Sequence, residues 1–330
     1  MMPAPEPTAR PPQRSPPAAA ILLVPLAVAL VLTLFAWPSA RVAPRDLPIG
    51  LAGPPASARA IEKRLAAREG AFDLHSYPNE AAARRAIEDR DIYGAFVATP
   101  TGARVLTASA ASPAVAQLLE RAASETRARG SAGAVEVEDV VSAPRGAALA
   151  SSVLPLVLAG ILAGAAAAHL ASGSWGRVGL LVAASVLCGL VATAIVQSWL
   201  DVIEGDWLAN VAALSLTVLA TASIVAGLYA LFGPPGAIAG ALTMVLVGNP
   251  FSGVGSAPEL LPRPAGTIGQ LMPPGAGGNL LRSTGFFDGA AAGGHVAVLA
   301  AWTFAGLALL LAAGTRARRP ATKRAPIPAE

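Results

Sequence analysis

Residues 18–37 read AAAILLVPLAVALVLTLFAW, an apolar stretch without a single charged side chain. A transmembrane helix needs about 20 mostly apolar residues to cross a hydrocarbon core of about 30 Å, so this stretch is long enough by itself. A long polar segment follows, and then come five further apolar stretches. The spans that we expect there are residues 147–171, 178–200, 208–231, 236–247 and 296–313. This uneven spacing predicts a membrane α-helical protein with six transmembrane helices and a small extracytoplasmic α/β domain between helices 1 and 2.

The composition of the whole chain agrees with a membrane protein. Hydrophobic residues make up 54% of it and charged residues 13%, whereas a soluble domain carries about 25% charged residues. More than half of the charges lie within residues 41–145, where acidic and basic side chains nearly balance, as on a solvated globular surface. The basic excess elsewhere flanks the apolar stretches, so the pI of about 9.8 does not indicate binding to nucleic acid.

The stretch at residues 236–247 is the shortest of the six. It ends before Asn249-Pro250 and has few residues for a full crossing, so a re-entrant segment is the alternative. A full crossing requires a helix that begins near Phe232 and holds Pro234 and Pro235 in its first turn. The charge distribution favours the crossing, because re-entry would separate the basic C-terminal segment from the other basic segments.

Basic residues beside the spans predict the orientation, since Lys and Arg are retained on the cytoplasmic side. Arg10 and Arg14 precede the first span, Arg177 follows the second, and residues 315–330 form a basic tail. The segment at residues 201–207 lies on the opposite side and carries three acidic residues and no basic one. We therefore expect a multi-pass protein of a bacterial plasma membrane, with both termini in the cytoplasm and the α/β domain outside.

The first span is expected to be an uncleaved anchor. Its apolar region exceeds the 7–15 residues usual for a signal peptide, and the sequence WPSA at residues 37–40 lacks a clean small-x-small cleavage site. Residues 1–17 are rich in proline and poor in apolar side chains, which predicts a disordered cytoplasmic tail.

Residues 45–144 alternate short β-like segments with amphipathic helical ones, which predicts a small α/β domain with a mixed sheet. The expected strands are residues 47–52, 72–77, 93–98, 103–107 and 135–141, and the expected helices are residues 56–68, 80–89 and 113–127. The third and fourth strands are expected to form a hairpin that turns at residues 100–102.

The sequence offers little catalytic chemistry. His75 is the only histidine of the domain, and no acid or nucleophile stands at a diagnostic spacing from it. Thr107, Ser109 and Ser112 lack a base and better suit a strand end and a helix cap. Neither G-x4-GK[ST] nor a strand–helix G-x-G-x-x-G occurs, and the single cysteine, Cys188, allows no internal disulfide. We expect no enzymatic activity, no metal and no cofactor.

The expected spans hold no Asp, Glu, Lys or Arg at mid-membrane depth. Ion-coupled transporters usually place such residues there, so the sequence disfavours this mechanism. Asn210, Thr217 and Thr221 fall on one face of the fourth span, where they either line a substrate path or make interhelical hydrogen bonds. Gly160 and Gly164 permit close helix packing, either within the chain or in a dimer.

The loop at residues 249–290 is rich in Gly and Pro, yet it carries pairs of large apolar residues. These pairs are Leu260-Leu261, Leu271-Met272, Leu280-Leu281 and Phe286-Phe287. A fully exposed linker would not need them, so we expect short amphipathic or half-buried helices on the outer rim of the bundle.

One span, a large external domain and five further spans make up a layout that resembles the ABC-2-type transporter permeases, in particular their phage-infection-protein-like branch. The last external loop of that branch has a pattern S/G-x-x-x-P-x-E-x-L-P, followed by L-P and a terminal L-R. Similar residues here are Ser256, Pro258, Glu259, Leu260, Leu261, Pro262, Gln270, Leu271, Pro273, Pro274, Leu280, Leu281 and Arg282. Residues 80–100 likewise resemble the family's short helix that leads into a strand ending in Pro.

The resemblance implies a permease subunit that moves a hydrophobic or envelope-related substrate outward. A separate cytoplasmic ATPase, a second copy or a related permease, and membrane lipid would be its partners. Glu259 and Arg282 are then candidates for an ion pair or a gate contact. The full set of candidate loop residues is Pro258, Glu259, Pro262, Pro273, Pro274 and Arg282.

The expected cytoplasmic loops at residues 172–177 and 232–235 are short for docking an ATPase. The alternative is therefore a non-transporting envelope receptor or scaffold, whose external domain binds a partner while the helices anchor it.

Overall fold

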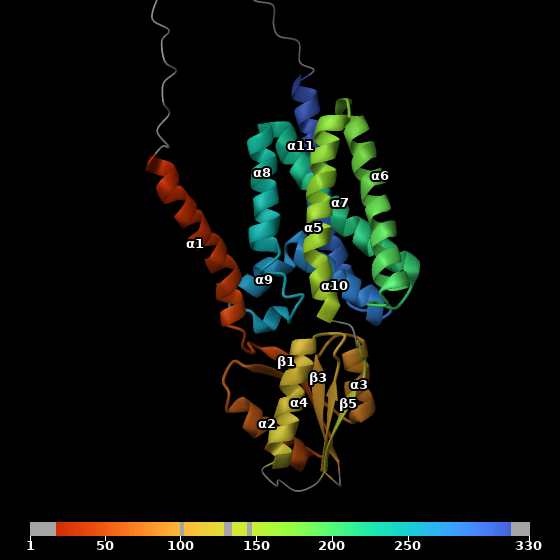
Figure 1. Ribbon diagram of the computed structural model, residues 1–330. Coiled ribbons are helices and arrows are strands. Elements are labelled where there is room, and N and C mark those ends of the chain that lie inside the picture. Colours follow the sequence, from red (N-terminus) through yellow and green to blue (C-terminus); the bar gives the residue numbers. More distant parts are fainter. Residues whose placement is uncertain (1–17, 100–101, 129–133, 144–146, 318–330) are drawn as a thin grey trace, which may run out of the picture.

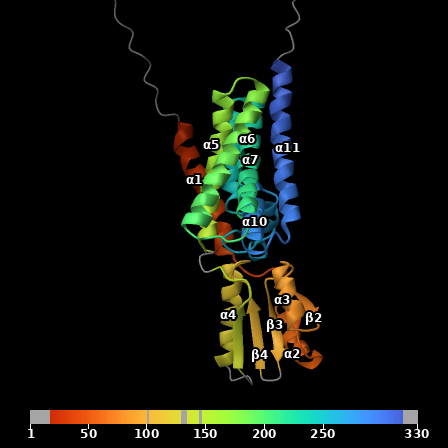
Figure 2. The ribbon, with the colours of Figure 1, turned by 90° about the vertical axis from the view of Figure 1, so that its right-hand side faces the viewer.

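The computed structural model of the chain describes residues 18–99, 102–128, 134–143 and 147–317. It has two parts, a helical bundle and an α/β domain at one end of the bundle (Figures 1 and 2). The expected tail at residues 1–17, most of the expected basic tail at 315–330 and the tip of the expected hairpin lie outside the described residues.

Five helices in the described part of the chain are long and apolar enough to cross a membrane. They are α1 (Ala18–Ala40), α5 (Ala147–Leu170), α6 (Gly173–Thr193), α7 (Trp207–Phe232) and α11 (Ala292–Ala317). Their length and composition are those of a membrane protein with several spanning helices.

A shorter apolar helix stands beside these five. It consists of α8 (Pro234–Thr243) and the π-helical turn η2 (Met244–Gly248). Its first turn holds Pro234 and Pro235, which is the arrangement that we expected for a full crossing. Only Gly233 separates it from α7, so the loop expected at residues 232–235 is a single residue with a φ of 68°. At 1.5 Å per residue, this helix is roughly 22 Å long.

The helix α6 begins at Gly173, so the loop expected at residues 172–177 is wrong, and Arg177 lies in the first turns of the helix. At its other end α6 continues as the π-helix η1 (Ala194–Trp199). Trp175 and Trp199 are 74% and 77% exposed near the two ends of this continuous helix. They are roughly 36 Å apart along it, and such exposed tryptophans are typical of membrane–water interfaces.

The central helix of the bundle is α7. In the most apolar 18-residue stretch of α7, 72% is buried inside the protein. The corresponding share is 6% for α1, which stands apart from the other helices (Figure 1). Gly160 and Gly164 of α5 pack directly against α7: a Cβ at Gly160 would lie 2.7 Å from the Thr221 Cβ, and one at Gly164 would lie 2.7 Å from the Ala222 carbonyl oxygen. These small residues therefore serve packing within the chain.

Gly306 gives a direct test of this close packing. A Cβ at Gly306 would lie 2.3 Å from the Ser223 carbonyl carbon, so Gly306→Ala forces α11 away from α7. We expect a loss of about 2 kcal/mol in the free energy of unfolding, the usual scale for overpacking. The measurement is thermal unfolding in detergent. Gly293→Ala in the same helix is the matched control, because a Cβ there meets nothing within 4 Å; equal effects of the two substitutions would contradict the packing.

The domain contains one five-stranded mixed sheet in the order β2-β1-β3-β4-β5. Only β3 and β4 pair antiparallel. The strands are β1 (Leu47–Ala52), β2 (Phe72–Tyr77), β3 (Gly94–Thr99), β4 (Gly102–Thr107) and β5 (Ala134–Asp139). Each begins and ends within two residues of its expected range, because turn residues bound every apolar run.

Three helices cover the sheet: α2 (Pro55–Ala66), α3 (Glu80–Glu88) and α4 (Pro113–Ala128). Right-handed crossovers place α2 and α4 on one face and α3 on the other. Two helix caps are visible in the sequence: Asn79 Oδ1 accepts from the Ala82 N–H at 2.9 Å, and Ser112 Oγ accepts from the Val115 N–H at 3.2 Å. The expected cap role of Ser112 is thus confirmed.

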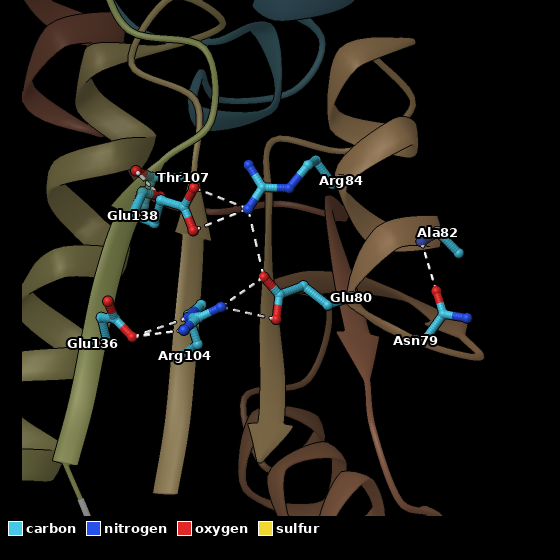
Figure 3. A network of polar contacts seen from close by, with 8 residues as sticks. All are labelled: Asn79, Glu80, Ala82, Arg84, Arg104, Thr107, Glu136 and Glu138. Carbon is cyan, nitrogen blue, oxygen red and sulfur yellow. Dashed lines mark hydrogen bonds and ion pairs between the residues drawn. The ribbon is translucent and has the colours of Figure 1, made fainter.

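A ladder of ion pairs fastens α3 to the far edge of the sheet (Figure 3). Arg84 of α3 pairs with Glu138 of β5 at 2.9 Å, and Arg104 of β4 pairs with Glu80 at 2.8 Å and with Glu136 at 2.8 Å. These side chains are 29–65% exposed, and exposed pairs of this kind contribute about 1 kcal/mol or less each. These charged side chains therefore have a structural role, because they link α3 to the sheet.

Candidate functional site between the domain and the bundle

The chain between α8 and α11 lies at the domain-facing end of the bundle (Figure 1). It contains the 3-10 turn η3 (Pro258–Leu260), α9 (Ala265–Gln270) and α10 (Pro273–Phe286). Twelve of the fourteen residues of α10 are buried, so this helix is not the half-buried rim helix expected from the sequence. Its apolar pairs pack into the bundle and against the domain instead of covering an outer surface.

Small residues let α10 enter the bundle. A Cβ at Gly277 would lie 2.3 Å from Thr217 Cγ2 of α7, and a Cβ at Gly278 would lie 2.3 Å from Val254 Cγ2. Two prolines, Pro273 and Pro274, fill the first turn, where their missing N–H groups cost no helical hydrogen bond. The Gly- and Pro-rich composition thus indicates a tightly packed helix and not a linker.

Two arginines from different parts of the chain converge on Asn279 of α10. Arg90, at the end of α3, donates from Nη2 to Asn279 Oδ1 at 3.1 Å, and from Nη1 to the Asn279 carbonyl oxygen at 3.0 Å and to Ser283 Oγ. Arg282 donates to Asn279 Oδ1 at 3.4 Å and to the Val254 carbonyl oxygen at 2.9 Å. These bonds join the domain to the bundle through one side-chain amide.

The two guanidinium groups have only neutral hydrogen-bond acceptors among the described residues. Arg282 is 2% exposed, and its Nε has no partner there. Burial, with the charge of Arg90 as a smaller cause, lowers the pKa of Arg282 to about 10. Burial also lowers the pKa of Arg90. Two like charges held beside one buried amide cost free energy. Groups with strongly shifted pKa values cluster at functional sites, so this pair of arginines marks a candidate site.

Glu259 lies on the domain side of this cluster. Its Oε2 accepts a hydrogen bond from the Tyr93 hydroxyl at 2.8 Å, and burial, together with this carboxylate, raises the pKa of Tyr93. The ion pair expected between Glu259 and Arg282 does not occur among the ion pairs of the described residues, because Arg282 is taken up by acceptors from α10 and from the loop at Val254.

A second set of hydrogen bonds extends from α10 into the bundle. Asn210 of α7 accepts from Thr284 Oγ1 at 2.7 Å, and its Nδ2 donates to Gln197 Oε1 of η1 at 3.0 Å. The expected interhelical bonds of the polar face are therefore made by Asn210. Thr217 and Thr221 bond to carbonyl oxygens of α7 itself and lie against Gly277 and Gly160, respectively.

The remaining candidate loop residues hold backbone positions. Pro258 begins η3, and Pro262 accepts a hydrogen bond from the Ala265 N–H at 2.8 Å, just before α9. The sequence named Gln270 only as part of the family-like loop pattern, and it did not single out Arg90, Asn279 or Gln197. Gln270 Oε1 accepts a hydrogen bond from Asn279 Nδ2 at 2.6 Å. The only sequence signal for this cluster was the presence of two amide side chains, Gln270 and Asn279, in a Gly-rich loop.

An apolar groove of about 620 Å³ opens on the side of the bundle between α5 and α6. Its wall includes Pro155 of α5, Leu187 and Cys188 of α6, and Leu281 of α10. The groove therefore extends from the lateral face of the bundle to α10. The π-helix η1 contributes Ile195 and Val196 to the groove wall, and π-helical turns often occur at functional sites.

Comparisons with protein-family models, curated proteins and solved structures found no match for this chain.

Proposed function

We propose that this protein is the permease subunit of an exporter, and that α10 is its gate on the side of the α/β domain. The observation that carries the proposal is the position of α10. It is buried in the end of the bundle, bonded to the domain through Arg90 and to α7 through the Thr284–Asn210 pair. A movement of the domain would therefore displace the element that closes the bundle.

The proposal includes six membrane crossings with α8 and η2 as the fifth. In Figure 1, α1 begins and α11 ends at the end of the bundle away from the domain, as six crossings require. Arg177 is at that same end, and retention of basic residues favours the cytoplasm there. The α/β domain is then extracytoplasmic, and the helices lie in the plasma membrane of a bacterium.

The lateral groove supports a hydrophobic substrate. Its lining is almost entirely apolar and faces the lipid side of α5 and α6, and it ends at Leu281 of α10. A lipid-like molecule in the bilayer could enter this groove sideways and reach the gate without crossing a polar surface. The spans carry no acid or base at mid-membrane depth for an ion-coupled mechanism, so the energy is assigned to a separate cytoplasmic ATPase.

The experiment is purification of the full chain in mild detergent from its bacterial source, followed by an assay for ATP hydrolysis in the eluate. We expect a co-purifying ATPase in stoichiometric amount. Arg177→Glu reverses the basic charge at the end away from the domain and is expected to reduce the bound ATPase activity at least about fivefold, as loss of an interface charge pair does. Arg59→Glu, an exposed arginine of α2, is the matched control.

Absence of any ATPase from repeated preparations would contradict the exporter. If the α/β domain captured an envelope protein in the same preparations and no ATPase, the receptor or scaffold alternative would replace it.

A further inference from the structure

A groove of about 930 Å³ lies on the α/β domain between α2 and α4, over the sheet. Leu65, Phe72, Phe96 and Leu118 line it and are all only half-buried, so their apolar surfaces remain open to the groove. The volume is within the range of about 300–1,000 Å³ that holds small-molecule ligands. Neither α2 nor α4 fills this part of the sheet face.

The groove runs along one face of α4. The lining residues of this helix recur at helical spacing and are Ala114, Gln117, Leu118, Leu119, Arg121, Ala122 and Glu125. From the first to the last of them the helix rises by roughly 16 Å. The groove is therefore elongated along α4, a shape that suits an extended chain.

One end of the groove adjoins the membrane part. It is lined there by residues 42–44, which follow α1 directly, and by Leu260 of η3. The Leu260 carbonyl oxygen accepts from the Ala43 N–H at 3.0 Å and from Arg45 Nη1 at 2.8 Å, which fixes this end beside the bundle. A molecule in the adjacent membrane leaflet thus has a short route into the groove.

Two arginines stand on the rim. Arg68 and Arg121 are exposed, and their guanidinium groups make no hydrogen bond or ion pair within the part of the chain that the structure describes. Glu125, farther along the same rim, has an interaction of its own. Two available positive charges beside an apolar floor are complementary to a ligand with an anionic end and an apolar chain.

We propose that this groove binds a single-chain amphiphile with an anionic headgroup, drawn from the adjacent membrane leaflet. The chain lies on the apolar floor and the headgroup is held by Arg68 and Arg121. This site is separate from α10, and binding there requires neither transport nor an ATPase.

The test is photo-cross-linking of the full chain in phosphatidylcholine nanodiscs, with a hexadecyl phosphate that carries a diazirine in its chain. We expect labelled peptides that contain Leu65–Phe72 and Leu118, located by mass spectrometry. The double substitution Arg68→Glu with Arg121→Glu is expected to lower this labelling about tenfold, since each exposed charge pair changes an equilibrium by no more than about fivefold. Labelling of the membrane helices stays unchanged.

Three controls make the result decisive. Arg85→Glu, an exposed arginine of α3 on the opposite face of the sheet, should label like the wild type, and all variants should unfold at the wild-type temperature. Unlabelled dodecyl phosphate should compete, whereas inorganic phosphate at equal concentration should not. Leu118→Gln should weaken labelling without altering the rim charges.

Label confined to the membrane helices would overturn the proposal. So would labelling of the groove that persists in the double variant, or competition by inorganic phosphate as strong as by dodecyl phosphate. None of these results bears on the ATPase partner, so this site and the exporter stand or fall separately.

Discussion

Replacing Asn279 by Leu is expected to destabilise the protein by about 4 kcal/mol. Asn279 Oδ1 accepts from both Arg90 and Arg282, and its Nδ2 donates to Gln270. Leu is close to Asn in size but removes all these partners, and a buried charged group that loses its acceptor costs several kcal/mol. Arg90 would keep its bonds to the Asn279 carbonyl oxygen and to Ser283, and Arg282 its bond to Val254, but both would lose the amide oxygen that they share.

Thermal unfolding in detergent measures this effect. For a chain of this size about 1 kcal/mol corresponds to about 2–4 °C, so the midpoint should fall by roughly 10 °C. Asn249→Leu is the matched control, because the Asn249 side chain makes no hydrogen bond to the described residues. A midpoint for Asn279→Leu within 2 °C of this control would show that the amide does not hold the two arginines.

The second large effect concerns the charge of Arg282. Burial lowers its pKa to about 10, well below its ordinary value, so the folded state at neutral pH carries a charged group that it disfavours by about 3 kcal/mol. Gln at this position keeps a hydrogen-bond donor and removes the charge. We therefore expect Arg282→Gln at pH 8 to unfold at a higher temperature than Arg282→Ala, because both remove the unfavourable charge but Ala also loses the donor and leaves a cavity at this buried position.

The pH dependence of the free energy of unfolding tests whether the charge of Arg282 is unfavourable in the folded state. From about pH 10 up to the ordinary pKa of arginine, the unfolded wild type binds more protons than the folded wild type, so the free energy of unfolding of the wild type rises with pH there. Arg282→Gln lacks this rise. The free energy of unfolding of the wild type should therefore gain about 1 kcal/mol relative to Arg282→Gln between pH 10 and pH 11. Denaturant titrations at the two pH values measure it, with Arg85→Gln as the exposed control. A difference that is constant or moves the other way contradicts the buried charge.

Hydrophobic length and turn residues were enough to predict most elements of the fold. Every strand of the domain was found within two residues, since apolar runs bounded by Gly, Pro and Asp allow few alternatives. The start of α6 was misplaced because Gly173–Arg177 contains two glycines and an arginine, a composition that favours a loop, although the stretch is helical and its Ser174 lies against Gly314 of α11. Tertiary contact overrides local preference there.

The candidate site was only partly accessible to sequence reasoning. Asn210 was visible as a polar residue on one face of an apolar span and Arg282 through the family-like loop pattern, and both make buried bonds of the site. Arg90 was not, because nothing in the local sequence distinguishes it from the nearby arginines of α3; its role comes from a contact with a residue 189 positions away. Long-range pairings of this kind carry no periodic signal in the sequence.

The isolation of α1 has a consequence for the order of folding. All the packed helices of the bundle come from one continuous segment, residues 147–317, whereas α1 and the domain precede it. The two parts can therefore assemble as separate units, each from contacts that are nearer in sequence. The bonds between Arg90 and α10 join residues at least 189 positions apart, and Arg45 bonds to Leu260 across 215 positions, so we expect these contacts to form last, as the step that joins two structures already folded.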